Sequence, residues 1–187
     1  MLFNGINIAA FHLVQGIASP ALNFIMSYWA ESYYLVLPLI AIYLYYRRDR
    51  NVYSFVFATV FLFIIANVLK DIFMEPRPCS LPDLSWINHV ACESGYSFPS
   101  DHAVTLTGLA FFAKGYKYLR IAYIVWLLAI LFGRVYLGQH YLTDVVAGAI
   151  ISIIVAYVIY KYRDRVNSFL NKALQALRLG IFTSRFN

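Results

Sequence analysis

The feature that most constrains this chain is a run of residues, Val52 to Leu69, that carries no charged side chain and ends at Lys70. A helix that crosses a membrane needs about 20 mostly apolar residues, so this run is long enough to form one. The whole 187-residue chain has the same character, since 61% of its residues are hydrophobic and 13% are charged. Soluble domains carry about 25% charged residues, and the composition therefore indicates an integral membrane protein.

Shorter uncharged segments lie on both sides of that run: Ser32 to Tyr46, Ala103 to Ala113, Ile121 to Gly133 and Val145 to Tyr160. Each reaches the length of a span if polar groups at its ends are tolerated. We therefore predict five membrane spans, at about residues 30–47, 51–71, 100–116, 119–136 and 142–162. The predicted fold class is an all-α polytopic membrane helix bundle.

The two ends of the chain are expected to differ from this bundle. Residues 1–30 are uncharged, but Gly16 and the pair Ser19-Pro20 interrupt them, and serine before proline favours a helix start. We expect two short interfacial helices here, although the segment could form a sixth span. Residues 1–165 would make one integral-membrane domain. Residues 166–187 are predicted to form an amphipathic cytoplasmic helix and tail, which could instead make a dimer contact. Its apolar positions are Val166, Phe169, Leu170, Ala173, Leu174 and Leu177, and its polar ones are Asn167, Asn171, Lys172, Gln175 and Arg178.

The formal net charge of +6 is distributed in short clusters between apolar segments, which indicates a membrane partner and no nucleic acid. Three clusters are Arg47, Arg48 and Arg50; Lys114, Lys117 and Arg120; and Lys161, Arg163 and Arg165. Because consecutive spans alternate in direction, all three clusters fall on one side. The positive-inside rule makes that side cytoplasmic and predicts a multi-pass plasma-membrane protein.

Polar residues gather where four predicted spans meet the opposite, extracytoplasmic face. They are Lys70, Arg77, Ser100, His102, Arg134, His140 and Asp144. Ionisable groups inside a membrane are costly, and a convergent set indicates a functional site.

The cations of this set favour an anion as ligand. Lys70, Arg77 and Arg134 provide positive charge, and the planar fork of arginine suits phosphate oxygens. Ser100 can cap the third span, which leaves the backbone amides of Asp101, His102 and Ala103 directed at the same anion.

The histidines favour phosphoryl transfer at that anion. His140 and Asp144 are four residues apart, so on the first turn of a helix the carboxylate can orient one ring nitrogen and present the other as a nucleophile. His102 on a neighbouring helix can then donate the proton. Because the set contains no evident group of carboxylates for Mg²⁺, we expect a reaction that needs no metal or other cofactor.

Cys79 and Cys92 both fall in the extracytoplasmic connection, where oxidation is permitted, so a disulfide between them is a reasonable expectation. Two semi-buried thiols, or a zinc site that includes His89, are the alternatives.

Three segments resemble the signature of the type 2 phosphatidic acid phosphatase superfamily, K-x6-R-P, P-S-G-H and S-R-x5-H-x3-D. They are "KDIFMEPRP" from Lys70, "PSDH" from Pro99 and "GRVYLGQHYLTD" from Gly133. Two positions depart from the pattern: Gly133 replaces serine, which would remove a hydroxyl from the phosphate pocket, and Asp101 replaces glycine. The form "FPSDHA" is similar to the branch of undecaprenyl-diphosphatases and their archaeal relatives.

The resemblance implies a role for each residue. His140 would attack phosphorus to form a phosphohistidine, Asp144 would orient it, and His102 would protonate the leaving oxygen and later activate water. The phosphoryl oxygens would be bound by Lys70, Arg77, Ser100 and Arg134, with the amides near Asp101.

We therefore expect a phosphatase that converts a polyprenyl diphosphate to its monophosphate. Another lipid phosphate, such as phosphatidylglycerol phosphate, phosphatidate or lipid A, is the alternative substrate. A channel or transporter is a remoter alternative, because the middle of each predicted span is nearly free of charge. The sequence leaves the oligomeric state open.

Overall fold

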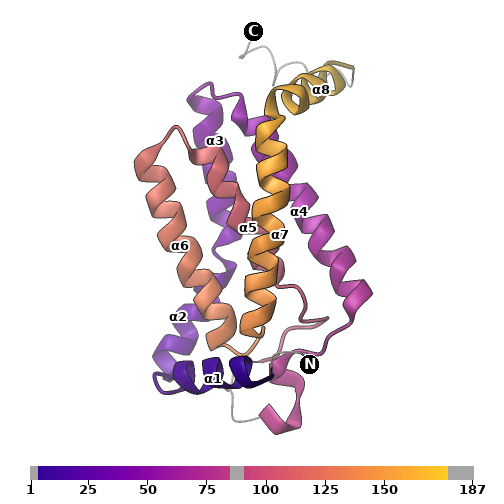
Figure 1. Ribbon diagram of the computed structural model, residues 1–187. Coiled ribbons are helices and arrows are strands. Elements are labelled where there is room, and N and C mark those ends of the chain that lie inside the picture. Colours follow the sequence, from indigo (N-terminus) through magenta and orange to yellow (C-terminus); the bar gives the residue numbers. More distant parts are fainter. Residues whose placement is uncertain (1–3, 85–90, 177–187) are drawn as a thin grey trace.

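A computed structural model describes residues 4–84 and 91–176 of the chain. These residues form a bundle of α-helices, which confirms the predicted fold class (Figure 1). The helices are α1 (Asn4–Gln15), α2 (Pro20–Glu31), α3 (Tyr33–Tyr46), α4 (Asn51–Phe73), α5 (Asp101–Leu106), α6 (Lys117–Tyr136), α7 (Leu142–Lys161) and α8 (Arg163–Ala176). Three 3₁₀ segments join them: η1 (Pro78–Ser80), η2 (Pro82–Leu84) and η3 (Thr107–Ala113).

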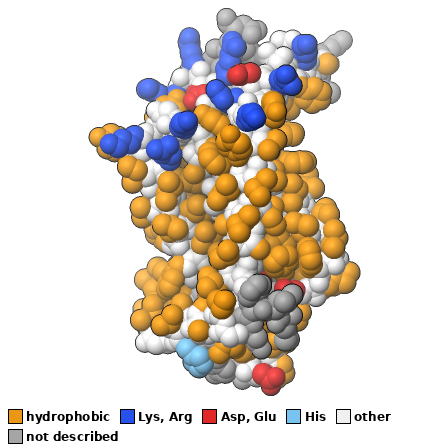
Figure 2. Space-filling view, in the orientation of Figure 1, with side chains coloured by type: hydrophobic (Ala, Val, Ile, Leu, Met, Phe, Trp, Pro, Cys, Tyr) orange, Lys and Arg blue, Asp and Glu red, His pale blue; other side chains and the backbone are white. Residues whose placement is uncertain are grey.

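Among the described residues, three helices, α4, α6 and α7, are long and apolar enough to cross a membrane, and a bent pair could make a fourth span. Large apolar side chains on them face outward, including Phe63, Leu128 and Ile154, which are 49%, 60% and 59% exposed. Such a surface suits lipid rather than water. Figure 2 shows the apolar band, with Lys and Arg side chains gathered at one end near α8.

Two of the five predicted spans are shorter than expected. The segment predicted at 30–47 yields α3, which has 14 residues and contains Pro38. The segment predicted at 100–116 is split between α5 and the 3₁₀ segment η3. Because a 3₁₀ helix rises about 2.0 Å per residue against 1.5 Å in an α-helix, α5 and η3 still reach about 23 Å.

Two glycines let α5 and η3, which together form the third predicted span, pack closely against α7. A Cβ atom on Gly108 would lie 2.3 Å from the Cβ of Ala156, and its backbone N–H donates to Ser152 Oγ at 2.8 Å. A Cβ atom on Gly148 would lie 3.0 Å from the carbonyl oxygen of Ser100. The close approach therefore needs glycine at both positions, and it places the start of α5 beside the start of α7.

The N-terminal segment forms two helices, as favoured from its sequence, but α1 is more than an interfacial helix. Helices α1 and α2 are bent by 119°, and α1 lies across the end of the bundle (Figure 1). Phe11 is fully buried there against the ring of Tyr141, and the side chains of Asn7 and Thr143 are hydrogen-bonded at 3.1 Å. Helix α1 thus closes the end at which α7 begins.

At the other end of the bundle, helix α8 follows α7 after a break at Tyr162. One polar position was misplaced by the sequence pattern. Asn167 was expected on the polar face, but it is buried and its Oδ1 accepts a hydrogen bond of 2.5 Å from Ser54 Oγ of α4. A buried polar group is tolerated when it finds such a partner, and periodicity alone does not reveal it. Residues 177–187 of the predicted tail lie outside the described residues.

Candidate active site

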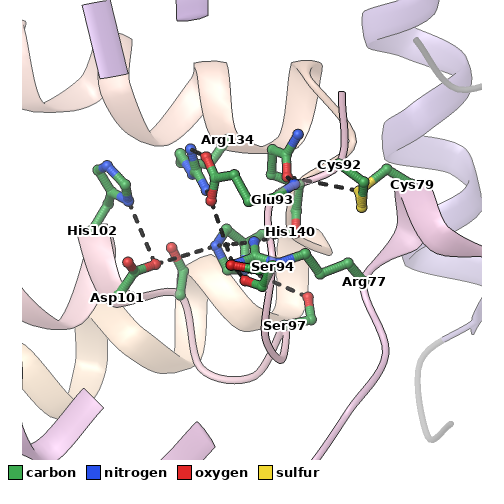
Figure 3. Close-up of polar contacts among 12 residues, drawn as sticks. Arg77, Cys79, Cys92, Glu93, Ser94, Ser97, Asp101, His102, Arg134 and His140 are labelled. Atoms are coloured by element: carbon green, nitrogen blue, oxygen red, sulfur yellow. Dashed lines mark hydrogen bonds and ion pairs between the residues drawn. A yellow bond between two sulfur atoms is a disulfide. The ribbon is translucent and has the colours of Figure 1, made fainter. Parts of the chain in front are cut away.

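The predicted site residues lie where α4 ends, α5 begins, α6 ends and α7 begins, at the end of the bundle away from the Lys and Arg clusters (Figures 1 and 2). A connected set of contacts joins them, so the structure brings the predicted residues together (Figure 3). Most of their side chains are buried; Arg77 is 4% exposed, Arg134 1%, and His140 and Asp144 0%.

His140 lies in the turn between α6 and α7, where its backbone N–H donates to the carbonyl of Arg134 at 3.2 Å. The sequence had placed it on the first turn of a helix with Asp144, but α7 begins two residues later, at Leu142. His140 Nδ1 lies 3.7 Å from Asp144 Oδ2 and 3.4 Å from Ser97 Oγ. The pair therefore joins the turn before α7 to the first turn of α7. Asp144 can still orient the His140 ring, as predicted.

Ser97 connects His140 to Asp144, and sequence reasoning missed it. Its hydroxyl donates to Asp144 Oδ2 at 2.5 Å, and the same oxygen accepts the backbone N–H of Tyr141 at 2.9 Å. Because that proton is used on the carboxylate, Ser97 Oγ can accept Nδ1–H of His140. Ser97 is fully buried, and its backbone N–H donates to the carbonyl of Glu75 at 2.7 Å.

The other ring nitrogen, His140 Nε2, faces Arg77 NH1 at 3.3 Å and Asp101 Oδ1 at 3.4 Å. A guanidinium can only donate, so the contact with Arg77 requires an unprotonated Nε2, whereas Asp101 can accept a proton from it. The contact with Arg77 fits a neutral ring with a proton on Nδ1 and a lone pair on Nε2, whereas the contact with Asp101 fits the opposite tautomer. In the first form the lone pair, which a nucleophile needs, is directed at Arg77 NH1.

Asp101 lies among the groups that were expected to hold an anion. Its Oδ1 is 3.2 Å from Lys70 Nζ and 3.5 Å from His102 Nδ1, in addition to its contact with His140. A carboxylate repels a phosphate, so only the backbone N–H of Asp101 suits the predicted phosphate contact. The side chain instead serves as a counter-ion of Lys70 in the site as it stands.

Ser100 and His102 occupy the start of α5. Ser100 Oγ accepts the backbone N–H of Ala103 at 3.5 Å, which is the predicted cap, and its side chain is fully buried. Neither ring nitrogen of His102 makes a hydrogen bond within the described part of the chain, and the ring of Tyr33 packs edge-on against it at 5.0 Å. His102 is therefore held by packing and by the contact of its Nδ1 with Asp101, and its Nε2 is left for a ligand.

Arg134 makes its main contact with Glu93, a second residue that sequence reasoning missed. Its NH1 and NH2 donate to the two carboxylate oxygens of Glu93, the first at 2.6 Å, and Arg77 NH2 lies 3.4 Å from Glu93 Oε2. Burial raises the pKa of Glu93, but the hydrogen bonds and charge of Arg134, followed by the charge of Arg77, outweigh it and hold the pKa below its ordinary value. Both arginines that were expected to bind phosphate are thus paired with an internal carboxylate.

The segment that carries Glu93 is fixed at several points. Cys79 and Cys92 are joined by a disulfide. The side-chain amide of Gln139, a third missed residue, accepts the backbone N–H of Glu93 and donates to the carbonyl of Ala91, both at 3.0 Å. Glu93 directly follows Cys92, and Gln139 directly precedes His140. This adjacency was the one signal in the sequence that could have indicated either residue.

Gly133 does not open a gap in this site. A Cβ atom built on it would lie 3.4 Å from Met26 Sδ of α2. The position expected to have lost a hydroxyl from the phosphate pocket therefore sits against α2, where a Cβ atom would be in ordinary van der Waals contact with Met26.

Comparisons with known proteins fit this arrangement. The chain is 28% identical over 189 residues to the bacitracin transport permease protein BcrC of Bacillus licheniformis, covering 93% of this chain and 88% of that protein. It is 26% identical over 151 residues to an undecaprenyl-diphosphatase of Sulfolobus acidocaldarius, covering 77% and 72%. It is also 30% identical over 119 residues to mouse sphingosine-1-phosphate phosphatase 1, but that match covers 59% of this chain and only 27% of the longer relative.

Two crystal structures share the fold. Aquifex aeolicus LpxE is 27% identical with a TM-score of 0.73, covering 86% of this chain and 98% of that one. A phosphatidylglycerolphosphate phosphatase from Bacillus subtilis is 23% identical with a TM-score of 0.67, covering 85% of each chain. The family model described as "PAP2 superfamily" matches residues 51–168, which contain every predicted site residue. The chain therefore belongs to the PAP2 superfamily.

Proposed function

We propose that this protein is a membrane phosphatase that removes the terminal phosphate of a polyprenyl diphosphate and leaves the monophosphate lipid carrier. The observation that carries the proposal is the setting of His140. One ring nitrogen is oriented by Asp144 and Ser97, while the other faces Arg77, one of the cations that suit a phosphate. A positioned nucleophile beside preorganised positive charge is the arrangement that phosphoryl transfer requires.

The first step forms a bond between His140 Nε2 and the terminal phosphorus. The bond from phosphorus to the bridging oxygen breaks, its electron pair leaves with the lipid monophosphate, and His102 donates a proton to that oxygen. Asp144 stabilises the positive ring that forms, and Arg77 and Lys70 lie where they can neutralise the phosphoryl oxygens. In the second step His102 takes a proton from water, the water oxygen attacks phosphorus, and the bond to Nε2 breaks to release inorganic phosphate.

The surroundings of the site favour a lipid as substrate. The polar cluster lies at one end of helices whose outer surfaces are apolar, so a phosphorylated head can reach it while the chain stays in lipid. The Lys and Arg clusters lie at the opposite end, which by the positive-inside rule supports a site on the extracytoplasmic face of the plasma membrane.

The diphosphate is supported by two features. The relatives matched over most of their length include one named as an undecaprenyl-diphosphatase. Two separate carboxylates, Asp101 and Glu93, pair with different cations, Lys70 and the two arginines, so the site offers cationic partners for more than one anionic group. A lipid monophosphate, such as phosphatidate or lipid A, would use the same nucleophile and is the second candidate.

The decisive experiment is release of inorganic phosphate by the detergent-solubilised protein with excess EDTA present. Undecaprenyl or dolichyl diphosphate is compared with phosphatidylglycerol phosphate and phosphatidate, and His140→Ala is the inactive control. We expect turnover of the isoprenoid diphosphate to be fastest and to persist in EDTA. A preference for a glycerolipid would overturn the substrate, and loss of all activity in EDTA would overturn a metal-free reaction.

A transport activity is a separate candidate because a relative matched over 93% of this chain carries the name of a transport permease. Flux of protons or anions into protein-containing liposomes, without release of phosphate, would favour it.

A further inference from the structure

Glu93 pairs with both arginines that were expected to bind phosphate. Its carboxylate forms a two-pronged pair with Arg134 and also approaches Arg77, and such forked contacts are how arginine binds phosphate. Both arginines are almost fully buried, whereas the side chain of Glu93 is 37% exposed. The carboxylate therefore covers the two guanidinium groups from the outer side.

A phosphate cannot engage both donors of the Arg134 fork while Glu93 remains there. NH1 and NH2 of Arg134 are both used by Glu93, and the remaining nitrogen, Nε, is buried without a hydrogen-bond partner among the described residues. If Glu93 leaves without replacement, two buried positive charges lose their partner, which is costly. A phosphate that arrives as Glu93 leaves removes that cost.

The position of Glu93 is set by its neighbours rather than by the arginines alone. The preceding residue, Cys92, is bound covalently to Cys79, which lies two residues after Arg77. Gln139 holds the backbone on both sides of Cys92, and Arg77 NH2 donates to the carbonyl of Ser94 at 3.3 Å. The disulfide thus ties the segment that carries the covering carboxylate to the segment that carries one of the covered arginines (Figure 3).

We propose that Glu93 is a resident anion that competes with substrate phosphate for Arg134 and Arg77, and that the Cys79–Cys92 disulfide keeps it in place. This inference rests on the proposed phosphate site but not on the identity of the lipid. Glu93 then sets the affinity of the site for phosphate, because every ligand phosphate must displace the Glu93 carboxylate. The disulfide determines how readily Glu93 is displaced.

The test is equilibrium binding of inorganic phosphate, measured by isothermal titration of the full chain in detergent without any lipid substrate. Glu93→Gln should bind phosphate about tenfold more tightly than the wild type, because a charge-assisted pair no longer competes. Asp83→Asn is the matched control, since it removes an exposed carboxylate from the same connection, and its affinity should equal that of the wild type. Glu93→Ala repeats the test should the glutamine variant be poorly folded. Unchanged or weaker binding by the Glu93 variants would show that Glu93 positions the arginines for phosphate, and would overturn the proposal.

The contribution of the disulfide is measured by a double-mutant cycle. Cys79→Ser with Cys92→Ser should also tighten phosphate binding, and should add nothing further once Glu93→Gln is present. An equal gain with and without Glu93 would overturn the tethering role. If the wild type binds phosphate but hydrolyses no isoprenoid diphosphate, the proposed substrate fails while the role of Glu93 is supported. If neither the wild type nor any variant binds phosphate, the resident-anion proposal fails.

Discussion

Ser97→Ala tests whether the hydroxyl between His140 and Asp144 supports catalysis. The change removes the hydrogen bond of 2.5 Å from Ser97 Oγ to Asp144 Oδ2 and the contact of 3.4 Å to His140 Nδ1. A hydrogen bond to a charged group contributes about 1.5–3 kcal/mol, which corresponds to about a ten- to hundredfold loss of rate if it is expressed in the transition state. Asp144 keeps its hydrogen bond from the backbone of Tyr141, so we expect the protein to fold.

The assay is the kinetics of phosphate release, with kcat and KM determined separately. Ser97 contacts the nucleophile and its carboxylate partner, so the loss should appear in kcat with little change in KM. Ser27→Ala is the control, because its hydroxyl bonds within α2 to the carbonyl of Asn23. A Ser97→Ala enzyme with kcat within twofold of the wild type, or one that changes only in KM, would show that the Ser97 hydroxyl does not support the nucleophile.

Three further predictions follow from the same contacts. His102→Ala should slow hydrolysis of a lipid monoester more than that of a lipid diphosphate, since an alkoxide needs a proton donor more than a phosphate leaving group does; equal losses for the two substrates would contradict the assigned role. Gly148→Ala places a Cβ atom 2.9 Å from the Cβ of Ala103, so overpacking should cost about 1–3 kcal/mol and lower Tm in a thermal melt. Gly115→Ala, with nothing within 4 Å, is its control, and equal Tm values would show that the α5–α7 contact is not close. The arginine pairs lower the pKa of Glu93, so they stabilise the fold above the ordinary glutamate pKa and this contribution is lost as pH falls through the folded pKa. The difference in Tm between wild type and Glu93→Gln should therefore be largest near neutral pH and shrink in acid; a constant difference would argue against the ion pair.

The sequence predicted the parts of the site that lie on regular helices. Span ends can be read from charge-free runs, and the alternation of consecutive spans then places Lys70, Arg134 and Asp144 at one end of the bundle without any knowledge of packing. The contacts of Lys70 with Asp101, and of Asp144 and Arg134 with His140, show the same convergence in space.

What the sequence did not predict lies in connections or depends on packing. Ser97 and Glu93 belong to a segment without periodicity, so no pattern could indicate that they reach Asp144 and Arg134. The 3₁₀ form of η3 follows from contact with α7 at Gly108, which is a tertiary effect. The role of the Asp101 carboxylate also depends on a tertiary contact, because its side chain pairs with Lys70.

In the proposed mechanism, His140 Nε2 carries the phosphoryl group between the two steps. Rapid mixing of the enzyme with a terminally ³²P-labelled isoprenoid diphosphate, followed by alkaline quench and mass spectrometry of the labelled peptide, tests this directly. We predict an acid-labile, alkali-stable phosphate on His140 that His102→Ala preserves for longer and Asp83→Asn leaves unchanged. Phosphate release at the normal rate with no label on His140, or by a His140→Ala enzyme, would contradict the account.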